Sequence, residues 1–248
     1  MIYTPKGLAH TINPPITSFV KVITNTEFKE CVNKECKVMS TYHTGSGIAI
    51  NILKNVRTVM TAGHVCDSGI KESLNTTIKV LDHEGTLHAS WPVLISQYNQ
   101  KNTADLCVLY VPSLSLKRVN FSTSPPRVGE DVYYIGSPLG IYHPPTVPIL
   151  KGVFSGDINE GSSMATVPVI GGASGSGVFN SKDEIVGIIF ATNPLFHHVS
   201  LMSNHATFIK FVKAAKKRLQ KINIETLPKI SNNIRVYKEY LCLHYLNK

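Results

Sequence analysis

The sequence is poor in charged residues, aromatic residues and long apolar runs. Charged residues make up 17% and aromatic residues 8% of the 248 residues. No apolar run reaches the roughly 18 residues that a membrane-spanning helix needs. The first residues lack a basic stretch followed by an apolar core, so we expect no secretory signal. The expected location is therefore the cytoplasm, a host cell or a virion.

Cysteine is also scarce, with Cys31, Cys36, Cys66, Cys107 and Cys242 in the whole chain. Because no secretory signal is expected, the sequence predicts mostly reduced thiols. Cys31 and Cys36 could form half of a zinc site, but no second Cys/His pair follows at a suitable spacing. We therefore expect no metal and no cofactor.

The chain has fewer acidic than basic residues, and the excess positive charge lies at the C-terminal end. The formal net charge is +9, of which residues 206–248 carry +8. This basic segment is either a solvated surface or a docking site for nucleic acid or another acidic surface. The sequence contains no recognised nucleic-acid-binding motif that would favour the second interpretation.

Most of the chain has the pattern of short strands at spacings of about ten residues, which is typical of a β-sandwich or β-barrel. The expected strands cover 18–24, 47–53, 56–62, 77–81, 86–91, 106–111, 131–136, 149–156, 163–167, 177–180 and 184–191. Residues 112–128, rich in Ser and Pro, are the expected linker between two halves. Apolar residues at helical spacing predict one helix from Asn204 to about Asn223, with Asn204 as its N-cap.

A histidine, an aspartate and a serine occur in sequence, each among small or apolar residues. His64 ends an apolar strand, Asp105 begins another, and Ser174 lies in the glycine-rich turn 172–177. A serine hydroxyl needs a nearby base to become a nucleophile, and that base needs a third group to fix its tautomer. The order His, Asp, Ser is that of chymotrypsin-type serine hydrolases and differs from the subtilisin and α/β-hydrolase orders.

The segments 61–65, 105–109 and 172–180 resemble the three motifs of trypsin-like serine peptidases, in the bacterial and viral branch that includes the Deg and glutamyl endopeptidase types. The likeness covers about residues 16–215. It implies an all-β fold of two six-stranded antiparallel β-barrels, with the active site between them and a C-terminal helix. The expected domains are residues 1–115, 116–205 and 206–248.

The resemblance also implies roles for individual residues. His64 is the expected base, Asp105 the orienting carboxylate and Ser174 the nucleophile. The N–H groups of Gly172 and Ser174 are the expected oxyanion hole. Ala173 stands where peptidases activated by cleavage carry an aspartate, so we expect no N-terminal activation switch.

By the same resemblance, Pro168, Val169, Ile189, Phe190 and Ala191 are expected to wall the substrate pocket. None of them carries a charge, and burying an unpaired substrate charge would be costly. The sequence therefore predicts a serine endopeptidase that cleaves polypeptides after small or medium apolar residues. The maturation of viral or phage proteins is a role compatible with this prediction. The alternative is a catalytically silent fold of the same type that binds protein or nucleic acid.

Overall fold

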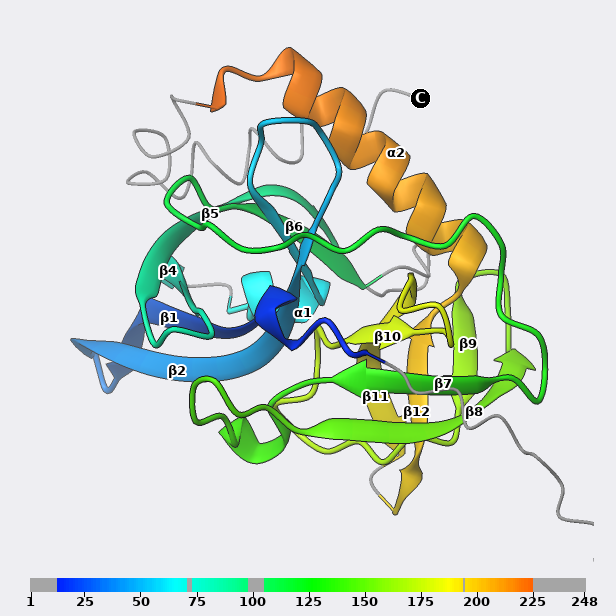
Figure 1. Cartoon of the computed structure of the whole chain (residues 1–248). Helices are drawn as coiled ribbons and strands as arrows, with labels where there is room; N and C mark the ends of the chain where they lie inside the picture. Colours follow the sequence, from blue (N-terminus) through cyan, green and yellow to red (C-terminus); the bar gives the residue numbers. More distant parts are fainter. Residues whose placement is uncertain (1–12, 71–72, 98–104, 194, 225–248) are drawn as a thin grey trace, which may run out of the picture.

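The computed structural model describes residues 13–70, 73–97, 105–193 and 195–224. These residues form two closed antiparallel barrels of six strands each, one from the first half of the chain and one from the second (Figure 1). The strand order is β1-β2-β3-β6-β5-β4 in the first barrel and β10-β11-β12-β9-β8-β7 in the second. The predicted fold class is confirmed.

The elements follow one another in a simple order. The first barrel contains β1 (Phe19–Val32), β2 (Glu35–Ile50), β3 (Thr58–Thr61), β4 (Ser73–Leu81), β5 (Leu87–Ser96) and β6 (Leu106–Tyr110), with the short helix α1 (Gly63–Cys66) after β3. The second contains β7 (Asp131–Ile135), β8 (Ile149–Asp157), β9 (Ser162–Ala165), β10 (Gly177–Phe179), β11 (Ile185–Asn193) and β12 (Phe196–Ser203). Single 3₁₀ turns span Ile16–Ser18 and Pro138–Gly140, and helix α2 (His205–Lys221) follows β12.

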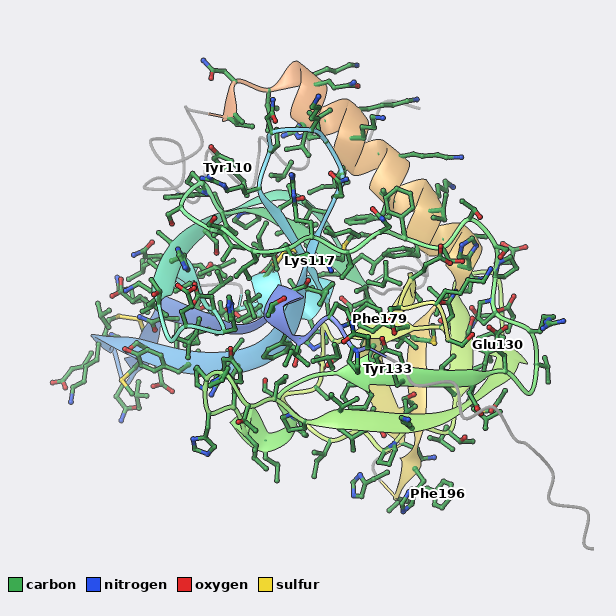
Figure 2. All side chains as sticks on the ribbon, in the orientation of Figure 1. Tyr110, Lys117, Glu130, Tyr133, Phe179 and Phe196 are labelled. Carbon is green, nitrogen blue, oxygen red and sulfur yellow. A yellow bond between two sulfur atoms is a disulfide. The ribbon has the colours of Figure 1, made fainter. Side chains whose placement is uncertain are left out.

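Each barrel has its own apolar interior, and a third cluster joins them. β-Branched residues such as Val20, Val59 and Val80 fill the first barrel, because alternate residues of a strand point to the same face. The third cluster lies where the barrels meet, and in the second barrel Tyr133 stacks on Phe179 with ring centroids 5.2 Å apart (Figure 2). This shared core holds the two barrels against each other.

Helix α2 extends the shared core. The Asn204 side chain accepts a hydrogen bond of 2.8 Å from the N–H of Thr207, as expected of an N-cap. Phe208, Val212 and Leu219 are buried on one face, which packs on β5 and β6 of the first barrel and on β11 of the second. The helix ends at Lys221, close to the predicted end. No helix in the described ranges is both long enough and apolar enough to cross a membrane.

The predicted linker connects the barrels and also pairs with both of them. The N–H of Val119 bonds to Ala49 O at 3.0 Å on β2, and the N–H of Ser122 bonds to Ile185 O at 2.9 Å on β11. The connection is therefore hydrogen-bonded to each barrel. The boundaries at 115/116 and 205/206 stay predictions.

Two strand regions were missing from the sequence-based prediction. β12 closes the second barrel between β11 and β9. β1 and β2 are also much longer than expected, and they pair without interruption from Phe19↔Ile48 to Val32↔Glu35. Their outer part, beyond the residues that pair with β4, projects from the barrel as a two-stranded arm (Figure 1).

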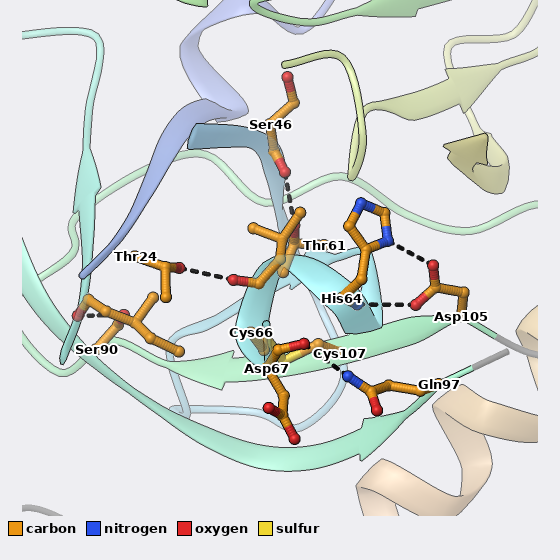
Figure 3. Close-up of a disulfide and its surroundings, with 12 residues drawn as sticks. Thr24, Ser46, Thr61, His64, Cys66, Asp67, Ser90, Gln97, Asp105 and Cys107 are labelled. Carbon is orange, nitrogen blue, oxygen red and sulfur yellow. Dashed lines mark hydrogen bonds and ion pairs between the residues drawn. A yellow bond between two sulfur atoms is a disulfide. The ribbon is translucent and has the colours of Figure 1, made fainter. Parts of the chain in front are cut away.

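The prediction of reduced thiols is wrong for four of the five cysteines. Cys31 and Cys36 face each other across β1 and β2 and form a disulfide, so neither is a zinc ligand. Cys66 of α1 is bonded to Cys107 of β6 (Figure 3). Cys66 was expected to be a reduced thiol in the core, but β6 supplies a partner because β6 pairs with β3, the strand that leads into α1. Cys242 and the basic residues beyond 224 lie outside the described residues.

Candidate active site

The structure brings His64 and Asp105 into direct contact. The Nδ1 atom of His64 lies 2.5 Å from Oδ2 of Asp105, and the backbone N–H of His64 donates to Oδ1 at 2.9 Å (Figure 3). The carboxylate is 7% exposed and the imidazole 46% exposed. Both carboxylate oxygens thus hold the same residue, which fixes the ring and leaves Nε2 toward the outside. Within the described ranges, Nε2 bonds to no protein atom.

Gly63 makes this two-point contact possible. A Cβ atom at this position would lie 2.5 Å from Oδ1 of Asp105 and still closer to the carbonyl oxygen of Ser96. Any side chain would therefore push the carboxylate away from the His64 N–H. Cys66 and Cys107, at the end of α1 and two residues after Asp105, tie the two segments together covalently. The pair is held by backbone packing and by a disulfide.

The Ser174 turn of the second barrel lies against the segment that leads into His64. A Cβ atom at Gly175 would come 3.1 Å from the N of Ala62 and would clash with Thr61 Oγ1. The N–H of Ser46 on β2 donates to Ser174 O at 2.7 Å, and the Thr61 hydroxyl donates to Ser46 O at 2.7 Å. Ser174 is half-buried. Among the described residues, the Ser174 Oγ has no hydrogen-bond partner. Hydrogen bonds between a nucleophile and its base are often long or poorly aligned without substrate and tighten when substrate binds.

Two backbone donors of the turn are unoccupied. Within the part of the chain that the structure describes, neither the N–H of Gly172 nor that of Ser174 donates to a protein acceptor. Their neighbours are engaged, since Ala173 N–H bonds to Ile170 O and Gly175 N–H to Ile189 O. Two free donors flanking Ala173 are the arrangement that an oxyanion hole requires.

A buried serine pair that sequence reasoning missed holds the turn in place. The Ser46 hydroxyl donates to Gly172 O at 2.9 Å and accepts from the backbone N–H of Ser137 at 2.9 Å. On the preceding peptide, Gly171 O accepts from Leu139 N–H at 2.6 Å. Because the C=O and N–H of a peptide point in opposite directions, this bond directs the Gly172 N–H away from Leu139. Nothing in the sequence pattern indicates these contacts.

Comparisons with known proteins identify the family and the fold. The model of the trypsin-like peptidase domain matches residues 45–188, which is more than half of the chain. The chain belongs to the trypsin-like peptidase domain family. A search of curated proteins gives no significant match.

Solved trypsin-like structures share the fold at low sequence identity. A serine endoprotease from Yersinia pestis is 17% identical, with a TM-score of 0.61 over 87% of this chain and 68% of its own. The Rv3671c protease from M. tuberculosis, in its active form, is also 17% identical, with a TM-score of 0.59 over 80% of this chain and 83% of its own. The expected trypsin-like resemblance is confirmed at the level of family and fold.

Four of the five expected pocket residues of this trypsin-like domain separate into two groups. Val169 and Ile189 are buried together with Ala173, the residue before Ser174, in the interior of the second barrel. Phe190 and Ala191 instead pack on the apolar cluster of the first barrel.

Pro168 lies outside both clusters. Its carbonyl oxygen accepts a hydrogen bond from the Tyr134 hydroxyl at 2.7 Å. Burial raises the pKa of Tyr134 well above its ordinary value, so this hydroxyl stays protonated and keeps donating. His197 and His198, which follow on β12, are both exposed. Among the described residues, no three His, Cys, Asp or Glu side chains are grouped so as to hold a metal ion.

Proposed function

We propose that the protein is a serine endopeptidase that hydrolyses peptide bonds through an acyl-enzyme. The observation that carries this proposal is the contact of His64 with Asp105 beside a turn that offers Ser174 and two unoccupied N–H groups. Each part has a distinct task in acyl transfer. The family membership supports the same reaction class.

In this mechanism, Ser174 Oγ attacks the scissile carbonyl carbon while His64 Nε2 takes its proton. The carbonyl oxygen becomes an oxyanion that the N–H groups of Gly172 and Ser174 stabilise. His64 then gives the proton to the leaving amine, and the acyl group stays on Ser174. Water then attacks the acyl carbon as His64 takes its proton, the bond from that carbon to Ser174 Oγ breaks, and His64 returns the proton to Oγ as the carboxylic product leaves. Asp105 remains ionised, holds the Nδ1–H tautomer and stabilises the imidazolium.

The pocket surroundings support a preference for small or medium apolar residues before the cleaved bond. Val169 and Ile189 have apolar side chains and pack with Ala173, the residue before Ser174. A charged substrate side chain would lose its hydration there without gaining a partner. A peptide-library profile dominated by Glu, Gln, Arg or Lys would contradict this preference.

The decisive experiment is labelling with a fluorophosphonate probe, which reacts with an activated serine. We expect the full chain to be labelled and Ser174→Ala to be unlabelled. The matched control is Ser176→Ala, two residues away and fully buried in the same turn. Absence of labelling in the wild-type protein would favour the alternative, a catalytically silent binding module.

Binding to nucleic acid or another acidic surface through residues 206–248 is a separate proposal. It is supported by Lys210, Lys213 and Lys217 of α2, which line a groove of about 790 Å³ together with Phe121 and Ile209. Phosphate contacts of this kind make binding salt-dependent. Retention on immobilised nucleic acid that falls with salt, and that is lost when the three lysines become glutamine, would support it.

A further inference from the structure

One face of β1 and β2 changes from apolar to polar where it meets the second barrel. Phe19 pairs with Ile48, and both belong to the shared core between the barrels. Two residues away on each strand, Lys21 pairs with Ser46. Because alternate residues of a strand point to the same face, Lys21 and Ser46 continue the face that packs on the second barrel. The shared core therefore ends at a lysine and a serine.

Lys21 reaches from this margin into the second barrel. It is half-buried, and its Nζ donates to the carbonyl oxygen of Gly140 at 2.9 Å. Within the described ranges, Lys21 pairs with no carboxylate. A cation that loses part of its hydration needs hydrogen-bond acceptors in return, and a bond from a charged donor is stronger than one between neutral groups. This bond therefore ties Gly140 to β1.

The loop that Lys21 holds has a strained backbone. Leu139 has a φ of 53° and Gly140 a φ of 73°, so two consecutive residues lie in the left-handed region. Glycine adopts this region at little cost, whereas leucine does not. Such a conformation persists only where the surrounding structure holds it. The Leu139 side chain is 69% exposed, so the hold must come from the hydrogen bonds of the loop.

Two neighbouring strands of the first barrel hold the two ends of this loop. Lys21 of β1 donates to Gly140 O at 2.9 Å, and the Ser46 hydroxyl of β2 accepts from the N–H of Ser137 at 2.9 Å. Within the loop, the N–H of Gly140 bonds to Ser137 O at 2.8 Å, so the ends are also tied to each other. The strained residue, Leu139, lies between these fixed points.

The loop is packed on the peptide that carries one of the unoccupied N–H groups. Leu139 N–H donates to Gly171 O at 2.6 Å, and this bond sets the direction of the Gly172 N–H. A Cβ atom at Gly172 would lie 2.9 Å from Gly140 N and 3.1 Å from Leu139 N, so no space separates the loop from the Gly172 backbone. A movement of Gly140 would therefore shift Leu139 N–H and, with it, the Gly172 donor.

We propose that Lys21 is a positioning residue for the oxyanion hole. Through the Gly140 carbonyl it holds Leu139 in its strained conformation and keeps the Gly172 N–H directed at the developing oxyanion. This inference rests on the proposed peptidase function. Lys21 acts only through the loop, so its loss weakens binding of the transition state and leaves binding of the substrate ground state nearly unchanged.

Lys21→Met tests the proposal, because it keeps a long side chain and removes the ammonium. We expect kcat for a peptide ester to fall about 10- to 30-fold, less than for deletion of a donor, and KM to change by less than about twofold. Lys21→Arg keeps a charged donor and should recover most of kcat. Lys79→Met, which removes an exposed lysine of β4, is the matched control and should change neither value.

A wild-type kcat in Lys21→Met, or a rise in KM alone, would overturn the proposal. Lys21→Gln, whose side chain is uncharged and shorter, gives the same test if Lys21→Met does not fold.

A matched pair of substrates reports on the oxyanion hole itself. A peptide ester develops negative charge on oxygen, whereas the corresponding thionoester develops it on sulfur, a weak hydrogen-bond acceptor. Lys21→Met should therefore lose about tenfold or more in kcat for the ester and much less for the thionoester. A smaller folded fraction would lower both rates by the same factor. Equal losses for the two substrates would overturn the proposal.

The strained residue provides a second, independent test. Asparagine tolerates the left-handed region better than leucine, so Leu139→Asn should depend less on Lys21. Added to Lys21→Met, it should raise kcat by about threefold or more, whereas in the wild type it should change kcat by less than about twofold. The same effect in both backgrounds would contradict an action of Lys21 through Leu139.

The two proposals fail in different ways. If the fluorophosphonate probe does not label Ser174 in the wild type, the peptidase function fails and the role of Lys21 fails with it. If the probe labels Ser174, but Lys21→Met cleaves the ester as fast as the wild type does, only the Lys21 proposal fails.

Discussion

Two histidine–aspartate pairs lie in the first barrel, and they differ in what surrounds the imidazole. His64 bonds through Nδ1 to Asp105 at 2.5 Å, and His88 bonds through Nε2 to Asp82 at 2.8 Å. Both carboxylates are nearly buried. The imidazole of His64 is 46% exposed, whereas that of His88 is only 9% exposed.

The pairs also differ at the second ring nitrogen. Nδ1 of His88 is 2.8 Å from the Ser113 hydroxyl, which completes an Asp–His–Ser chain. Asp82 also accepts the N–H groups of Glu84 and Thr86, and its carbonyl accepts the Tyr142 hydroxyl. This second chain stabilises the β4–β5 turn against the second barrel. Three residue types in contact therefore do not by themselves indicate an active site. The candidate site differs from the second chain by an open imidazole nitrogen beside unoccupied backbone donors.

The largest expected effect separates the two histidines. His64→Ala should lower kcat/KM for a peptide or ester substrate by about 10⁴-fold or more, because the general base and acid is lost. His88→Ala should change it by less than about fivefold, because His88 lies in a structural network. Steady-state kinetics on folded protein, checked by circular dichroism, measures both. Similar losses in the two variants would break the comparison.

Substitution of Asp105 and of Asp82 should affect activity as differently as substitution of the two histidines. In Asp105→Asn, the amide nitrogen must face one of the two N–H donors of His64, or the ring must change tautomer. We expect kcat to fall by roughly 10³- to 10⁴-fold with little change in KM. Asp82→Asn is the matched control and should keep nearly full turnover. An active Asp105→Asn would show that the pair does not orient His64.

Ser46 offers a smaller and more specific test of the unoccupied donors. Ser46→Ala removes the hydroxyl that bonds to Gly172 O. This carbonyl belongs to the peptide between the two that carry the unoccupied N–H groups, so the turn that presents both donors loses order. We expect kcat to fall by about 10- to 100-fold, less than for deletion of a donor, with KM nearly constant. Ser90→Ala is the control, since Ser90 is equally buried in the first barrel and donates to Ile78 O at 2.9 Å. A change in KM alone would contradict a role in positioning.

The sequence predicted the elements whose signals are local. Short segments of sequence are enough to recognise the periodic strands, the N-cap at Asn204 and the motifs around His64, Asp105 and Ser174. The family resemblance implied the two barrels. The arm could not be found in this way, because both faces of its strands are exposed and no apolar alternation marks it. β12 begins with the exposed residues Phe196, His197 and His198, and was missed for the same reason.

Contacts between distant segments were beyond sequence reasoning. Whether Cys66 has a partner depends on β6 pairing beside β3, and Ser46 matters only because the second barrel brings Gly172 and Ser137 to it. The chain Asp82–His88–Ser113 has the same residue types as the candidate active site but not the same order along the chain. It runs Asp, His, Ser along the chain, whereas the candidate active site runs His, Asp, Ser.

The smallest expected effect concerns pH and the second pair. Burial alone would raise the pKa of Asp82, but hydrogen bonds from His88 and from the N–H groups of Thr86 and Glu84 outweigh it and hold the pKa below the ordinary 3.8. A carboxyl whose pKa is lower in the folded state stabilises the fold above the unfolded-state pKa, and this contribution is lost as the pH falls through the folded-state value.

Urea unfolding of the wild type and of Asp82→Asn from about pH 6 to about pH 3 measures this contribution. At about pH 6, the wild type should be more stable than Asp82→Asn by about 1–2 kcal/mol. The substitution replaces a buried carboxylate that accepts several hydrogen bonds with a neutral amide. The difference should begin to shrink below about pH 4, where Asp82 of the unfolded chain takes up a proton, and should continue to shrink as the pH falls toward the lower pKa of the folded state. Activity per folded molecule should stay the same in both proteins, because the second pair supports the fold and not the reaction. A difference in stability that does not depend on pH would show that the charge of Asp82 contributes nothing to this network.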